Sequence, residues 1–174
     1  MTTMLTTTIP SGRVAVFAPS KDETDPAQMA VLETVRIAAR MIAPSRVWPS
    51  APHLAPGSDR PQGMLILLTY GLARQIYSSA EMLNHAICEE ALFDLCAGTL
   101  PEVAELQRFR QDNREIIEIC LVHTLTMLVG RRIAAGRITR TNPQTIRAEA
   151  KRRIIMTAFV DSLEAAAWQT SMCA

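Results

Sequence analysis

Basic residues gather in the last third of the chain. Between Arg131 and Arg153 the sequence holds eight of them, with Glu149 as its only acid. The eight are Arg131, Arg132, Arg137, Arg140, Arg147, Lys151, Arg152 and Arg153. Binding to a nucleic-acid backbone needs several cations along one surface rather than a fixed motif, and arginine pairs well with phosphate. The segment therefore predicts contact with phosphate groups, although a solvated helix face explains the same pattern equally well.

Residues able to hold a metal or to act as nucleophiles form no complete set. His85 stands about one helical turn before Glu89 and Glu90, as in half of a zinc site, but further ligands are absent from the sequence around it. His123 falls within an apolar stretch and is expected to be a hydrogen-bonded core histidine. Neither a Ser-His-Asp arrangement nor a Gly-rich phosphate loop can be read. We therefore expect no catalytic residue, no metal and no cofactor, and we do not expect an enzyme.

The cysteines and the lack of a sorting signal indicate where in the cell the protein is expected. The four cysteines have no CxxC spacing and are expected to be small core residues; they are Cys88, Cys96, Cys120 and Cys173. The amino-terminal residues have neither a positive start nor a sustained apolar run, so no secretory signal is expected. The longest strongly apolar run, Met64 to Leu68, is far shorter than the ~20 residues of a membrane span. A cytoplasmic protein without a membrane partner is the expectation.

The elements that position these residues are expected to be helices. The composition is 48% hydrophobic but only 5% aromatic, which favours helices over a β-sandwich. Helical spacing and helix start and stop residues predict helices over residues 25–43, 62–77, 78–98, from 99, over 112–136, and from 142 onward. The expected starts are Asp25, Ser78 with Glu81 three residues later, Thr99 with Glu102, and Asn142. The fold class is thus an all-α, compact multi-helix bundle.

The sequence also predicts how some of these helices pack. Gly71 allows a close neighbour for its helix, and the stretch after Asp112 is apolar around most of its circumference. That stretch is expected to be the central buried helix. In the short helix before it, Val103, Leu106 and Phe109 should face the core, while Glu105, Arg108 and Arg110 should point more outward.

The chain is expected to form one principal domain. Residues 1–24 form an amino-terminal arm, in which Val14 to Ala18 is either a short strand or an extended segment. The helical domain covers residues 25–170, and residues 171–174 form a tail. A connection over residues 44–61 holds five of the ten prolines and is expected to be a strap, which Trp48 and Leu54 dock onto the core.

One segment resembles a known family. Its matching residues are Leu67, Leu68, Tyr70, Tyr77, Ser78, Ser79, Ala97, Gly98, Arg108, Phe109 and Arg110. With these residues the stretch from Gly63 to Arg114 resembles the amino-terminal, non-catalytic helical domain of bacterial insertion-sequence transposases of the DDE class. The resemblance covers about a third of the chain and implies a helix-turn-helix-like element for DNA and assembly contacts.

The catalytic half of that family needs three carboxylates on a sheet-based scaffold to hold divalent metal. After Glu118 the only acids are Glu149, Asp161 and Glu164, all on one expected helix. The chain is therefore expected to lack strand-transfer activity. Before the arginine motif the family usually has an Asp-His pair and a Ser/Thr-rich step, whereas this chain has acids at Glu102 and Glu105, which would repel phosphate.

The sequence thus predicts a non-catalytic DNA-binding protein that contacts mainly phosphates and self-associates. The expected DNA-binding residues are Arg108, Arg110, Arg114, Arg131, Arg132, Arg137, Arg140, Arg147, Lys151 and Arg152. A homodimer is expected because apolar residues lie on more than one side of the last helix, including Ile155, Phe159, Leu163 and Trp168. The alternative is a protein-interaction or structural adaptor that retains the helical fold without binding nucleic acid.

Overall fold

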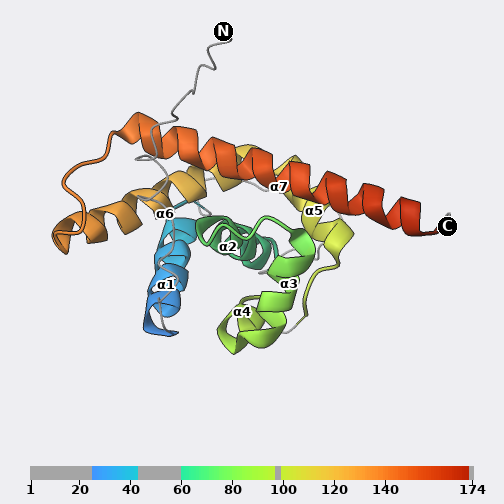
Figure 1. Ribbon diagram of the computed structural model, residues 1–174. Coiled ribbons are helices and arrows are strands. Elements are labelled where there is room, and N and C mark those ends of the chain that lie inside the picture. Colours follow the sequence, from blue (N-terminus) through green and yellow to red (C-terminus); the bar gives the residue numbers. More distant parts are fainter. Residues whose placement is uncertain (1–24, 43–59, 97–98, 173–174) are drawn as a thin grey trace, which may run out of the picture.

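The computed structural model describes residues 25–42, 60–96 and 99–172, and every regular element in these ranges is an α-helix (Figure 1). The helices are α1 (Asp25–Ile42), α2 (Arg60–Ala73), α3 (Ser79–Cys88), α4 (Glu90–Leu95), α5 (Val103–Asp112), α6 (Arg114–Ala134) and α7 (Pro143–Met172). The expected all-α fold is confirmed for this part of the chain. The expected arm over 1–24, most of the Pro-rich connection with Trp48 and Leu54, Gly98 and Cys173 lie outside the described residues.

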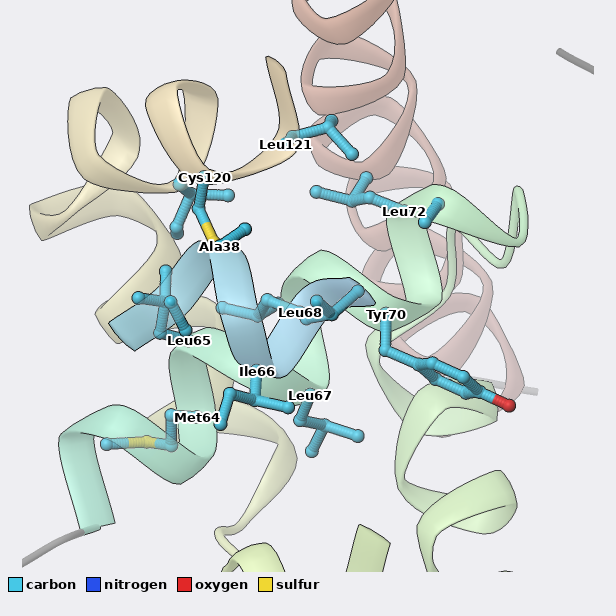
Figure 2. Close-up of a cluster of buried hydrophobic side chains, with 14 of the residues drawn as sticks. Ala38, Met64, Leu65, Ile66, Leu67, Leu68, Tyr70, Leu72, Cys120 and Leu121 are labelled. Carbon is cyan, nitrogen blue, oxygen red and sulfur yellow. The ribbon is translucent and has the colours of Figure 1, made fainter. Parts of the chain in front are cut away.

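Helix α2 is the centre of the fold. Every residue from Met64 to Ala73 is buried, and Figure 2 shows side chains leaving this helix on several sides, with Leu65 and Tyr70 pointing in opposite directions. A Cβ added at Gly71 would lie only 2.6 Å from Met82 Cγ of α3. The close approach predicted for Gly71 is therefore confirmed, because its missing side chain leaves room for α3.

The prediction that the helix after Asp112 is the central buried one is wrong. Helix α6 packs on α1, α2 and α7 with one face only, burying Ile117, Leu121 and Leu125. Its other face exposes His123 and Thr126. The core histidine expected at position 123 is thus a surface residue, because no helix of the described ranges covers that face.

Helix α1 packs against α6 and α2. The residues expected on its inner face are buried, namely Leu32, Val35, Ala39 and Ile42. Met29, which was expected with them, is 54% exposed. Met29 lies in the second turn of α1, beyond the part of the helix that its neighbours cover.

Side chains cap two of the predicted helix starts. Ser78 has extended backbone angles and its hydroxyl accepts the N–H of Glu81 at 3.1 Å, so the capping prediction is confirmed. Asn142 Oδ1 likewise accepts the N–H of Gln144 at the start of α7. The predicted start at Thr99 is wrong, since α5 begins at Val103 and Glu102 is its N-cap residue.

Replacing Ser78 with alanine is expected to lower the free energy of unfolding by about 1 kcal/mol, because the Glu81 N–H loses its acceptor. Urea denaturation followed by circular dichroism measures this change. Ser162→Ala is the matched control, since its exposed hydroxyl only bonds back to the Ala158 carbonyl within α7. Equal effects of the two substitutions would contradict the capping role.

Helix α7 is the longest element, with 30 residues. In Figure 1 it crosses the whole molecule, and its carboxyl-terminal end extends past the neighbouring helices. Its inner face carries Ile146, Ala150 and Ile154, which are all buried. From Ile146 to Asp161, helix α7 therefore presents an inner face to the body and an outer face to solvent.

Candidate nucleic-acid interface

The turn between α6 and α7 places several basic residues at one end of the molecule. Helix α6 stops at Ala135, and Gly136 then adopts a positive φ of 68°, which glycine tolerates best. Asn142 and Pro143 restart the chain as α7. The two helix ends and their connection lie at the left of Figure 1, away from α4 and α5.

Three arginines of this turn are open to solvent. Arg137, Arg140 and Arg147 are exposed, and their side chains make no hydrogen bond or ion pair with any described residue. Arg131 and Arg132 lie on the last turn of α6, before the connection that carries Arg137 and Arg140. Arg131 is also exposed and donates a 3.0 Å hydrogen bond to the Ala30 carbonyl of α1, while Arg132 is half-buried. We call Arg131, Arg132, Arg137, Arg140 and Arg147 the turn cluster.

Lys151 and Arg152 continue the basic surface along α7, but both have acidic neighbours. The Lys151 ammonium lies 3.8 Å from Glu118, with its side chain 62% exposed. Arg152 donates to both carboxylate oxygens of Glu149 at 2.7 Å and to the Tyr77 hydroxyl at 3.4 Å. The bond to Glu149 raises the pKa of Arg152 despite its partial burial. Arg152 is therefore held in place by Glu149, a carboxylate that it shares with Arg153.

Glu149 joins two arginines and so differs from an ordinary surface acid. Partial burial alone would raise the pKa of its carboxyl, but hydrogen bonds and charge from Arg152 and Arg153 outweigh that effect and lower the pKa. Glu149 is thus ionised, and its negative charge is already matched by these two partners. The only acid of the basic segment does not offset the turn cluster.

Arg153 is a structural residue rather than a surface cation. Its side chain is fully buried and donates to the carbonyls of Leu72 and Ala73 at 2.9 and 2.8 Å, and to Glu149 at 2.7 Å. These carbonyls belong to the last turn of α2, where a cation is favourable. The sequence contained a signal for this role, because position 153 is three residues after buried Ala150, on the inner side of α7.

Arg110 is also buried, so the prediction that it points outward is wrong. It is 5% exposed and forms an ion pair with Asp161 of α7. Asp161 in turn accepts the Ser79 N–H at 3.0 Å and the Ser79 hydroxyl at 2.8 Å. Position 110 follows the buried Leu106 by one helical turn, and this register directs it inward. We call Arg110, Asp161 and Ser79 the buried triad.

The structure does not bring the ten predicted DNA-binding residues together. Arg108 and Arg114 are exposed on α5 and at the start of α6, but Arg131 follows Arg114 by 17 residues of the same helix, or about 25 Å. Exposed acidic residues flank this second group in the sequence, including Glu102, Asp112 and Glu115. The one acid near the turn cluster in sequence is Glu149, which is half-buried and bonded to Arg152 and Arg153, so the two groups differ in local charge.

Other candidate groups of the sequence are placed as follows. His85 Nδ1 lies 3.7 Å from Glu89, which also accepts the Tyr70 hydroxyl at 2.9 Å. Burial raises the pKa of Tyr70 to about 12.

Within the described ranges no three His, Cys, Asp or Glu side chains are grouped to hold a metal ion. Cys96 and Cys120 are buried as expected, whereas Cys88 is exposed on α3, which corrects its assignment to the core.

No family model, curated protein or solved structure gives a match. None of the helices in the described residues has both the length and the apolar character to cross a membrane. The resemblance of residues 63–114 to transposase amino-terminal domains stays a prediction from the sequence.

Proposed function

We propose that the chain is a non-catalytic DNA-binding protein, similar to a stand-alone transposase amino-terminal domain, that contacts phosphates with the turn cluster and self-associates. The observation that carries this proposal is the exposure of Arg137, Arg140 and Arg147, whose side chains have no acidic partner among the described residues. Arginines that need not break an ion pair are free to replace the counterions of a nucleic-acid backbone. Contacts of this kind position a protein on DNA without reading its sequence.

The proposed contact surface extends along α7 to Lys151. Its long pair with Glu118 is of the exposed type that contributes at most about 1 kcal/mol, so a phosphate can replace Glu118. Arg152 contributes less, because both oxygens of Glu149 hold it. Arg110 is left out of the proposed surface, since its guanidinium is buried. Arg108 and Arg114 belong to a separate, acid-balanced region.

Replacing Arg137, Arg140 and Arg147 together with alanine is expected to weaken duplex binding roughly 100-fold at low salt. The slope of log K against log salt should also fall by about 2 to 3, because each lost phosphate contact removes ~0.9. Electrophoretic mobility shift over a series of salt concentrations measures both quantities on the same duplex.

The matched control removes three arginine charges elsewhere, as Arg36→Ala, Arg40→Ala and Arg108→Ala. Arg36 is half-buried, while Arg40 and Arg108 are exposed; all three lie outside the turn cluster. We expect this variant to keep most of its affinity and salt slope. Equal weakening by the two triple variants would show that net charge alone, rather than the turn cluster, governs binding.

The alternative proposal is a protein-interaction or structural adaptor with the same fold. It is favoured by the exposed apolar residues of α7 and by the acids beside Arg108. Retention of the full chain on duplex DNA and on heparin at low and moderate salt separates the two proposals. Failure to bind any duplex or single strand at low salt would exclude the DNA-binding proposal and favour the adaptor.

A further inference from the structure

Two carboxylates from different helices lie beside the cations that continue the basic surface along α7. Glu118 of α6 lies 3.8 Å from the Lys151 ammonium. Glu149 of α7 accepts from Arg152 at 2.7 Å with both of its oxygens. The basic surface therefore has an open part, at the exposed arginines of the turn cluster, and a part whose cations already contact carboxylates of the chain.

The two carboxylates are not equally tied to the fold. Glu149 also accepts from the buried Arg153 at 2.7 Å, so releasing Glu149 would leave Arg153 without its counter-ion. Glu118 has Lys151 as its one ion-pair partner among the described residues. Of the two carboxylates, Glu118 is thus the one that can give up its partner without disturbing the core.

The contact between Lys151 and Glu118 has the form of a pair that another anion can replace. Its charged atoms are 3.8 Å apart, which is longer than a hydrogen bond, and the Lys151 side chain is 62% exposed. Exposed pairs of this type contribute little to stability. Arg114 and Glu115 lie one turn before Glu118 on α6, and their opposite charges leave no net excess beside it. A phosphate near Lys151 therefore competes mainly with the Glu118 carboxylate.

We propose that Glu118 is an autoinhibitory contact of the phosphate-binding surface. Its carboxylate holds Lys151 in the free chain, and a phosphate of the nucleic acid takes its place on binding. This inference rests on the proposed function and adds to it a residue that limits the affinity. The position of Glu118 on α6, across from Lys151 on α7, also makes it the acid that ends the basic surface on this side.

The spacing of the cations brings phosphates to this contact. Arg147 precedes Lys151 by four residues, which is one helical turn or about 6 Å along α7. Phosphates of one strand are spaced by about 3.4 Å along a duplex. A backbone that Arg147 holds therefore presents its next phosphates to Lys151 at high effective concentration. A polyanion displaces Glu118 in this way, whereas a single phosphate ion lacks this advantage.

Glu118→Gln tests the contact, because glutamine keeps the size of the side chain and removes its charge. We expect this variant to bind a short duplex about two- to fivefold more tightly at low salt, as removal of an exposed competing pair allows. Fluorescence anisotropy of a labelled duplex measures the affinity. Asp94→Asn is the matched control: it removes the same charge from an exposed residue of α4, which lies away from the turn cluster in Figure 1. The control should change the affinity by less than about 1.5-fold.

A double-mutant cycle with Lys151→Ala separates competition for Lys151 from general repulsion. In the Lys151→Ala background we expect Glu118→Gln to change the affinity by less than about 1.5-fold. An equal rise in both backgrounds would overturn the proposal, as would a Glu118→Gln effect no larger than that of Asp94→Asn. A chain of the original sequence that binds no duplex would instead contradict the proposed DNA binding itself. Circular dichroism establishes that all variants are folded.

Discussion

An Asp161→Ala variant is expected to lose about 3 to 5 kcal/mol of unfolding free energy, because it leaves the Arg110 guanidinium buried without a counter-ion. Both side chains of this pair are only 6% exposed. The substitution also removes the acceptor of the Ser79 N–H and hydroxyl at the start of α3. Urea denaturation followed by far-ultraviolet circular dichroism measures the loss.

Two further variants make this expectation specific. Asp94→Ala removes an exposed carboxylate of α4 and should change the unfolding free energy by less than about 0.5 kcal/mol. The double variant Arg110→Met with Asp161→Leu should recover only part of the loss, because apolar residues of similar volume can replace the buried ion pair but leave the Ser79 N–H and hydroxyl without an acceptor. A stability loss for Asp161→Ala no larger than that of Asp94→Ala would show that the triad does not hold α7 to α3 and α5.

Features governed by neighbouring residues could be predicted from the sequence. The Ser78 cap depends only on residues 78–81, and the start of α7 depends on Asn142 and Pro143. Both predictions were confirmed. They could be made from the sequence because a capping side chain bonds to N–H groups only two or three residues away. The same local rule misplaced the start of α5, where Glu102 and not Thr99 precedes the first turn.

Burial of charged residues could not be predicted in the same way. Arg110 pairs with a residue 51 positions away, and Arg153 donates to a carbonyl 81 positions away. In the structure each arginine lies three or four residues after a buried residue of its helix, Leu106 or Ala150, but without a known partner an arginine is expected in water. Which helix is central also depends on tertiary packing. Every residue from Met64 to Ala73 of α2 is buried, whereas α6 has an exposed face although its sequence is apolar around most of its circumference.

The basic segment therefore contains arginines with different roles. Arg137, Arg140 and Arg147 are available to a ligand, Arg152 is held by Glu149, and Arg153 joins α7 to the end of α2. The number of basic residues in the segment does not distinguish these roles. Their substitutions should separate cleanly, since removing the first group changes binding while removing Arg153 changes folding.

Replacing Arg153 with methionine is accordingly expected to lower the unfolding free energy by about 3 to 5 kcal/mol. Methionine fills similar space but leaves the Ala73 carbonyl without the arginine donor and the Leu72 carbonyl with the Gln75 N–H alone. It also leaves the half-buried Glu149 with only Arg152. Because Arg153 closes the last turn of the central helix, the loss should spread to the whole fold. Chemical denaturation of the purified chain provides the value.

Arg147→Met, on the same helix six residues earlier, is the matched control because its side chain is exposed and unpaired among the described residues. It should unfold within about 0.5 kcal/mol of the original chain, yet bind duplex DNA more weakly. Arg153→Lys should fall between the two arginine variants in stability, since one ammonium cannot reproduce the planar fork that reaches both carbonyls and Glu149. If Arg153→Met were as stable as Arg147→Met, then Arg153 would not anchor α7 to α2, and the separation of binding from folding arginines would fail at this residue.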